Sequence, residues 1–222
     1  MITTLFSSFE PSTFFFKINW IRSTLFTLFI PLSFWLIPSR IHIIWSSLIL
    51  KFYNEFKIIT KIKRNFLSII FIALFYFILI NNFIGLFPYI FTSSSHITFT
   101  FTIALPLWLT FIIFGWINNI IHIFTHLIPQ GTPFILIPFI VCIETISNII
   151  RPGTLAIRLS ANIIAGHLLL TLLGNTRNSI SLIPISFIIF IQLLLLILES
   201  AVSIIQAYVF SILRILYLRE IN

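Results

Sequence analysis

Two very long apolar tracts in the C-terminal half constrain the fold of this chain more than any other feature. They cover residues 134–174 and 183–219, and a short polar loop at 175–181 separates them. As a single helix, each tract would be about 60 Å long at about 1.5 Å per residue, whereas the apolar core of a bilayer is about 30 Å thick. Each tract is therefore either a pair of short membrane spans or one strongly tilted helix, and periodicity alone does not decide between them.

The composition places the rest of the chain in the membrane as well. Of the 222 residues, 59% are hydrophobic and only 8% are charged, against roughly 25% charged residues in soluble domains. Three further apolar stretches of span length cover residues 18–37, 66–91 and 99–124. We therefore predict a single membrane domain over residues 1–222, an all-α integral membrane protein with about five membrane-crossing helices.

A basic segment at 40–64 lies between the first two of these spans. The chain has a net charge of +8, from 13 Lys and Arg against 5 acids, and this segment holds many of the bases: Arg40, Lys51, Lys57, Lys61, Lys63 and Arg64. Its apolar residues Phe52, Phe56 and Ile59 fall at helical spacing. The pattern predicts an amphipathic helix on the inner membrane surface, in contact with anionic lipid and not with nucleic acid.

The same segment fixes the predicted orientation, because short loops rich in Lys and Arg remain on the inner side of a membrane. With five crossings the two termini lie on opposite sides, the N-terminus outside and the C-terminus inside. Arg214 and Arg219, close to the C-terminal end, agree with this orientation.

Each long tract carries one polar stripe on an otherwise apolar helix. At about 100° per residue, the polar residues of the first tract fall within roughly 80° of one another: Glu144, Asn148, Arg151, Arg158 and Asn162. Those of the second tract likewise share one face: Gln192, Glu199, Ser203 and Gln206. Because lipid offers no partners for such groups, we expect the stripes to face each other or a water-filled crevice.

Several of these residues also have a purely structural interpretation. Arg151 precedes Pro152 and Gly153, a potential helix break, and can anchor backbone carbonyls there or pair with Glu144. Glu144 can equally lie solvated near the inner interface. Asn148 and Ser203 are typical of polar groups that pack helices together in membranes.

Arg158 is the residue with the clearest functional signal. Its neighbours in the chain are almost all apolar, an arginine remains charged, and a central membrane position costs at least about 2.5–3.5 kcal/mol. A role in packing alone does not account for a residue with this free-energy cost. His167, off the first stripe, and Glu199 are groups that take up and release protons, which a permanently charged arginine does not do.

Five sequence motifs carry a family resemblance. The segment LAIRLSANIIAGH at 155–167 resembles the signature of subunit a of F-type ATP synthases, and PQGTP at 129–133 followed by IETIS at 143–147 resembles the mitochondrial branch. NFIGLFP at 82–88 and IQAYVF at 205–210 are also similar to this family. The motifs recur in order along nearly the whole chain.

The resemblance implies a proton-translocating stator subunit of the membrane-embedded Fo sector. In this family the last two helices form a tilted hairpin along the rotor ring of c subunits, which favours the single tilted helix for each tract. Arg158 matches the essential arginine that faces the carboxylate of each passing c subunit. His167 and Glu199 match the outer proton half-channel, and Glu144 and Asn148 the inner one.

The remaining site residues and partners follow from the same resemblance. Asn162 and Gln206 match polar neighbours of the arginine, whereas many relatives have an uncharged residue at Arg151. The implied partners are the c-ring, the peripheral stalk and other Fo subunits, in a complex that can dimerise in the mitochondrial inner membrane. The implied role is proton transport that drives ATP synthesis, by a subunit that is not catalytic alone.

Two other functions compete with this interpretation. A stand-alone channel or transporter explains the polar stripes, but it usually has internal repeats, and this sequence has none that we find. If the chain were a structural subunit of a respiratory complex, a charged Arg158 inside the membrane would have no explanation. No glycine-rich phosphate loop is present, so we expect no nucleotide, metal or other cofactor on this chain.

Overall fold

The computed structural model describes residues 9–11, 19–21, 23–24, 31, 37–60, 65–87, 90–118, 133–176 and 182–221. Over these residues the chain forms helices and no strand, which confirms the predicted all-α class. The α-helices are α2 (Arg40–Thr60), α3 (Asn65–Gly85), α4 (Ile97–Asn118), α6 (Ile137–Thr176) and α7 (Leu182–Ile221). Two short 3-10 helices, η3 (Ser93–Ser95) and η4 (Phe134–Leu136), precede α4 and α6.

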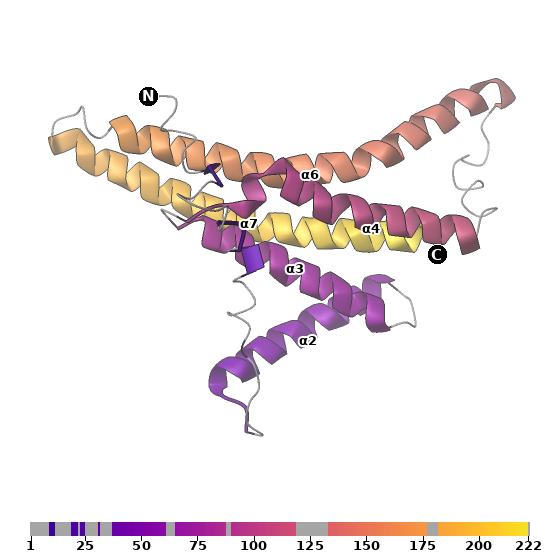
Figure 1. The fold of residues 1–222 in the computed structure, drawn as a ribbon, viewed down its shortest axis with the longest axis horizontal. Coiled ribbons are helices and arrows are strands. Elements are labelled where there is room, and N and C mark those ends of the chain that lie inside the picture. Colours follow the sequence, from indigo (N-terminus) through magenta and orange to yellow (C-terminus); the bar gives the residue numbers. More distant parts are fainter. Residues whose placement is uncertain are drawn as a thin grey trace.

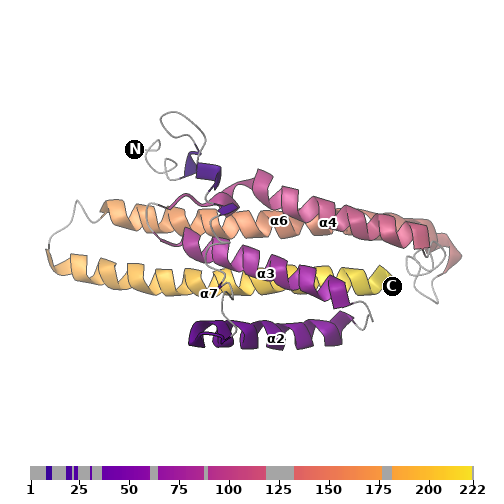
Figure 2. The same ribbon diagram turned by 60° about the horizontal axis from the view of Figure 1, so that its bottom comes forward.

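The two long apolar tracts each form one continuous helix of 40 residues. Figures 1 and 2 show α6 and α7 side by side and antiparallel, as the longest elements of the molecule. Figure 1 also shows α6 bending away from α7 towards its N-terminal end. Pro152 lies inside this curved helix, where a proline removes one backbone hydrogen bond and favours a bend. The alternative of two short spans in each tract is therefore wrong.

The shorter helices pack on this pair. α3 lies against α7, and α4 lies along α6. Buried side chains from all four helices form one continuous core cluster: Phe75, Ile78, Ala104, Leu155, Ala156, Leu159, Ala207 and Phe210. A second cluster joins α2 to α3, α4 and α7, with Phe56 from α2 fully buried in it.

Four of the described helices are long and apolar enough to cross a membrane: α3, α4, α6 and α7. Their outward faces carry large apolar side chains that water would not tolerate in such number, such as Phe187, Phe190 and Leu193 on α7. The chain is thus a multi-pass membrane protein. The predicted first span at 18–37 lies largely outside the described residues.

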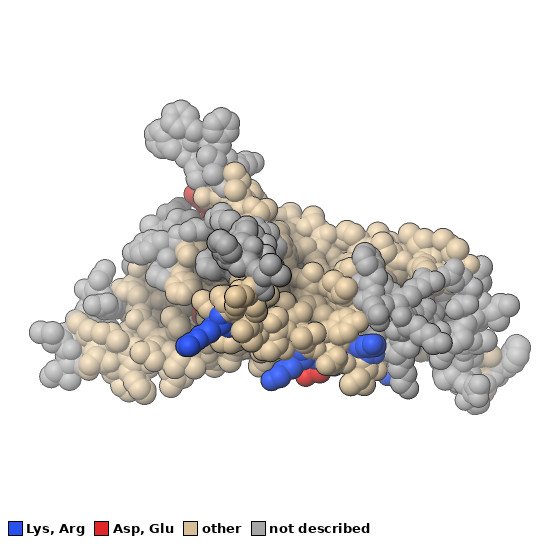
Figure 3. Space-filling view, turned by 90° about the horizontal axis from the view of Figure 1, so that it is seen from below, with Lys and Arg blue, Asp and Glu red and all other residues tan. Residues whose placement is uncertain are grey.

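α2 has one face against the helix bundle and one face that is exposed. Phe56 is buried against α3 and α7, whereas Lys51, Glu55 and Lys57 point outward. Figure 3, which looks at the molecule from below, shows a few charged side chains among otherwise uncharged residues. Exposed Leu50 and several isoleucines share this outward surface, so basic and apolar groups are mixed there.

Candidate functional site

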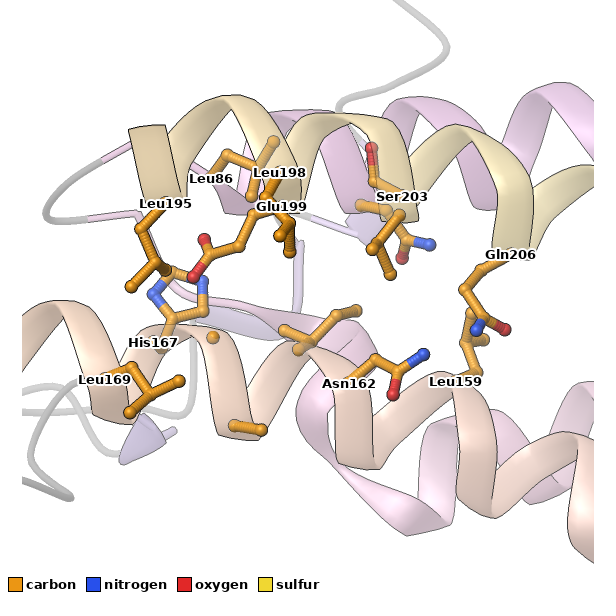
Figure 4. A pocket seen from close by; sticks show the side chains of 15 residues that line it. Leu86, Leu159, Asn162, His167, Leu169, Leu195, Leu198, Glu199, Ser203 and Gln206 are labelled. Atoms are coloured by element: carbon orange, nitrogen blue, oxygen red, sulfur yellow. The ribbon is translucent and has the colours of Figure 1, made fainter. Parts of the chain in front are cut away.

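A cavity of about 420 Å³ lies between α6 and α7 and is closed on one side by α3. Most of its wall is aliphatic. Six polar or ionisable side chains also line it: Asn82 from α3, Asn162 and His167 from α6, and Glu199, Ser203 and Gln206 from α7. Figure 4 shows His167 and Glu199 at one end of this cavity and Asn162 and Gln206 at the other.

The helical repeat explains why the α7 residues meet in one place. Glu199, Ser203 and Gln206 follow one another at spacings of about one turn, so a continuous helix places them on the same face. That face is turned towards α6, and Glu199 and Ser203 are only 9% and 6% exposed. The Ser203 hydroxyl donates to the Ser200 carbonyl at 2.7 Å, which is the usual internal bond of a helical serine.

Glu199 and His167 form the ionisable end of the cavity. Figure 4 shows the Glu199 side chain extending towards the imidazole. Both carboxyl oxygens of Glu199 and Nε2 of His167 are buried and have no hydrogen-bond partner among the described residues. The backbone of Gly85, at the end of α3, lies close to the His167 ring. The pair therefore presents free proton-binding atoms to the cavity.

Gly166 allows the carboxyl group to sit this close to α6. A Cβ atom at this position would lie 2.6 Å from the carboxyl carbon of Glu199 and 3.0 Å from its Cγ, nearer than non-bonded carbon atoms approach. Only a residue without a side chain leaves this space. The glycine next to His167 is thus a steric requirement for the position of Glu199.

Arg158 does not line the cavity and points outward from α6. It is exposed, whereas Leu155, Ala156 and Leu159 around it are buried in the core. Within the described ranges, no hydrogen bond or ion pair joins its guanidinium to another residue. The α6 stripe is predicted to face either α7 or a water-filled crevice. Asn162 lines the cavity beside α7, whereas Arg158 does not, and for Arg158 the second alternative stays a prediction. An arginine on the outer face of a membrane helix requires water or a partner chain to receive its charge.

Glu144 and Arg151 lie far along α6 from the cavity and contact each other. Arg151 Nη2 is 3.6 Å from Glu144 Oε1, and both side chains are about a third exposed, at 34% and 39%. The Arg151 guanidinium also lies over the ring of Tyr217 in α7, 5.5 Å from its centroid. Arg151 thus joins the two long helices at this end. The structural interpretation of Arg151 includes a pair with Glu144, and this is the contact observed.

Two further predicted site residues also lie outside the cavity. Asn148 is half-buried on α6, between Glu144 and Arg151 along the chain. Gln192 is half-buried on α7, where its Nε2 would be 3.9 Å from a Cβ at Gly174. Both residues stay near the α6–α7 contact without joining the ionisable end.

The sequence analysis missed two buried polar residues. Asn82 lines the cavity, is 3% exposed, and has neither side-chain heteroatom bonded within the described part of the chain. Two adjacent amides near the end of an apolar span, Asn81 and Asn82, the second inside a family motif, were the available signal. Arg214 was expected at the inner interface, but it is 0% exposed and packs over the Phe210 ring at 5.1 Å.

These features define a class of protein: a multi-pass, all-helical membrane protein with ionisable groups between two long helices and an arginine that points outward from the middle of one of them. Among the described residues, no three His, Cys, Asp or Glu side chains come together as a metal site.

The comparison with known proteins gives the family. Residues 14–219 match the family described as ATP synthase A chain. Similar proteins include ATP synthase subunit a of Drosophila melanogaster, which is 58% identical over 224 residues, with 100% of each chain covered. The subunit a proteins of Locusta migratoria and Anopheles gambiae are 59% and 54% identical, also with 100% of each chain covered. This chain therefore belongs to the ATP synthase subunit a family, a component of the Fo sector and not itself a catalytic subunit.

Proposed function

We propose that this chain carries protons through the Fo sector and couples their flow to rotation of the c-ring in the mitochondrial inner membrane. The observation that carries the proposal is the cavity in which His167 and Glu199 lie buried with unbonded proton-binding atoms. Ionisable groups inside a membrane protein are costly in free energy, and those that occur there are commonly functional. Imidazole and carboxyl groups are those that exchange protons most readily near neutral pH.

The cavity supports a short outer path for protons. A proton that reaches His167 or Glu199 can move along water among the polar groups towards Asn162 and Gln206, at the other end of the same cavity. From there the next acceptor lies outside this chain, on the carboxyl group of a c subunit. Once protonated, that group is neutral and can turn into lipid at little cost.

The position of Arg158 supports a role in the coupling step. It lies one turn from Asn162 along α6 and points out of the bundle. A fixed positive charge there favours the ionised form of a passing carboxyl group, and so drives release of its proton. The same charge repels protons and prevents a direct leak between the two sides. Each charge moved across the membrane yields about 2.3 kcal/mol per 100 mV.

The inner path is assigned to the opposite end of α6. Glu144 is about two-fifths exposed, at 39%, and it shares the stripe of Arg158 together with Asn148. A solvated carboxylate at this end can accept the proton that the c subunit releases. The basic residues of α2 support an orientation with the C-terminus in the matrix and the N-terminus in the intermembrane space.

The test is Arg158→Gln in the assembled complex, reconstituted in vesicles. We expect loss of ATP-driven proton pumping with assembly intact, because the passing carboxyl group no longer loses its proton. Arg219→Gln is the matched control, since Arg219 is an exposed arginine at the end of α7, and it should pump as the parent does. Normal coupled pumping by the Arg158 variant would contradict the proposal. A passive proton leak in the Arg158 variant is also expected, because the charge that blocks direct passage between the two sides is gone.

A further inference from the structure

A second polar cluster lies beside the cavity, in the connection between α3 and α4. Residues 92–95 are four consecutive hydroxyl residues, and all four are buried, at 2–5% exposure. Thr92 donates to the Ser95 hydroxyl at 3.1 Å, whereas the Ser94 hydroxyl has no partner within the described residues. The segment η3 packs against α6 as well as α3 and α4. Burying a hydroxyl group between apolar helices costs free energy unless the group is hydrogen-bonded to the protein or to water.

His96 follows this hydroxyl cluster and is half-buried. Its Nε2 is 3.0 Å from the Phe9 carbonyl. Because a carbonyl only accepts, Nε2 carries the hydrogen and Nδ1 remains the acceptor. The ring is held among aromatic neighbours, with Trp20 at 5.2 Å and Phe91 at 5.3 Å between ring centroids. His96 is thus fixed in orientation with one basic nitrogen still available.

Phe9 connects this histidine to the cavity. While its carbonyl accepts from His96, its ring packs edge-on against His167, with the centroids 6.0 Å apart and the planes at 89°. Gly85, at the end of α3, contacts both sides as well. Its backbone lies close to the His167 ring, and a Cβ there would lie 3.2 Å from the Thr92 methyl group. Phe9 therefore contacts both imidazoles, His96 through its carbonyl oxygen and His167 through its ring.

We propose that His96 is a further proton-transferring residue, located before His167 and Glu199 on the outer path, and that Phe9 separates it from them. This inference rests on the function proposed above. Nδ1 of His96 takes a proton from outer water and then releases that proton from the same nitrogen to a water molecule on the inner side, while the Nε2–H group stays bonded to the Phe9 carbonyl. The water passes the proton to Nε2 of His167, and His167 transfers it to the Glu199 carboxylate. Both imidazoles return to their starting charge, and the proton taken from outer water ends on Glu199.

Among the described residues, few other titratable groups near His96 could transfer this proton. On the N-terminal side the acid nearest in sequence is Glu10, which is exposed and follows Phe9. On the α6 side the titratable group is His167, beyond the Phe9 ring. The neighbours Trp20, Phe91 and Phe99 carry no charge.

The first test is His96→Gln in the assembled complex in vesicles, with ATP synthesis driven by an imposed proton gradient. A positioned acid–base group contributes about 10²–10⁴-fold to a proton transfer, and other steps share control of turnover. We therefore expect the synthesis rate to fall about tenfold, with a changed dependence on the outer pH. His42→Gln is the matched control, since His42 is exposed on α2, and it should behave as the parent. An unchanged rate and pH profile for His96→Gln would overturn the proposal.

A second pair of variants separates proton transfer from a structural role. Phe9→Ala opens a direct path for water to His167, so the double variant Phe9→Ala, His96→Gln should recover most of the lost rate. If His96 only holds the N-terminal segment in place, the double variant will be slower than His96→Gln alone, and the proposal fails. If the proposed function itself were wrong, Arg158→Gln would leave pumping intact, whatever result the His96 variants gave. The two failures are therefore distinguishable.

Discussion

The two ends of α6 hold ionisable residues in opposite ways. At the cavity end, His167 and Glu199 are buried and their proton-binding atoms have no partner within the described chain. At the other end, Glu144 and Arg151 are partly exposed, paired at 3.6 Å, and Arg151 is further held by Tyr217. The charges at this partly exposed end thus neutralise each other. The groups at the cavity end have no such partner, and they lie in a space large enough for water.

Burial alone does not make a functional site, as Arg214 demonstrates. It is more deeply buried than Glu199 and likewise lacks a hydrogen-bond partner among the described residues. However, it packs over the Phe210 ring and does not line the cavity. The comparison therefore predicts function where free ionisable groups meet a cavity, and only a cost in stability where they do not.

The largest effect is expected from Gly166→Ala. The new methyl group would overlap the Glu199 carboxyl group and push it away from His167. A displacement of about 1 Å at a reacting group can cost about a hundredfold in rate. ATP-driven pumping should fall by roughly that factor.

Gly153→Ala is the matched control for this variant, because it changes a glycine of the same helix with nothing within 4 Å of the new atom. It should leave pumping unchanged and stabilise α6 by up to about 1 kcal/mol. Equal losses in the two variants would show that helix geometry, and not the position of Glu199, sets the rate.

An intermediate effect, on stability and not on pumping, is expected from Arg214→Met. Replacing a buried charge by an apolar side chain of similar length removes an uncompensated desolvation cost. The resistance of the complex to thermal dissociation should rise by the equivalent of about 1–4 kcal/mol, with proton pumping unchanged. Arg219→Met at an exposed site should change neither. A loss of pumping in the Arg214 variant would contradict the distinction drawn between the two buried groups.

The smallest effect is expected from Arg151→Gln. Its ion pair is partly solvated, and such pairs contribute only about 0–1 kcal/mol. The cation–π contact with Tyr217 adds about 0.5–1 kcal/mol at exposed sites. We expect ATP-driven pumping within about twofold of the parent, an estimate that follows from these small energies. A large loss, or a shifted pH profile, would mean that Arg151 takes part in the inner proton path.

Much of this architecture was predictable, because membrane helices depend on local sequence. Apolar length and the few charges predicted the all-α membrane fold, and the helical repeat predicted that Glu199, Ser203 and Gln206 share a face. The length of the tracts did not decide between one helix and two, because Pro152 and Gly153 are compatible with either. α6 is bent and accommodates Pro152, and the helix continues on both sides of it.

Contacts between distant parts of the chain were not predictable. Asn82 reaches the cavity because α3 packs against α7, and Arg214 is buried because other helices pack on α7. Helical periodicity gives the face on which a residue lies but not which neighbour covers that face. The same limit explains Arg158, which shares a stripe with Asn162 but turns outward where the bundle offers it no contact.

The most direct test of the central idea is passive proton flow through vesicles that hold the complex stripped of its catalytic sector. An imposed membrane potential then drives protons through the Fo sector alone, and a pH-sensitive dye inside the vesicles measures the flux. Glu199→Gln keeps the size and hydrogen-bonding capacity of the side chain but cannot bind and release a proton. The account predicts flux in the parent and a loss of about a hundredfold or more in this variant. Flux equal to that of the parent would contradict it, because protons would then cross without the free carboxyl group in the cavity.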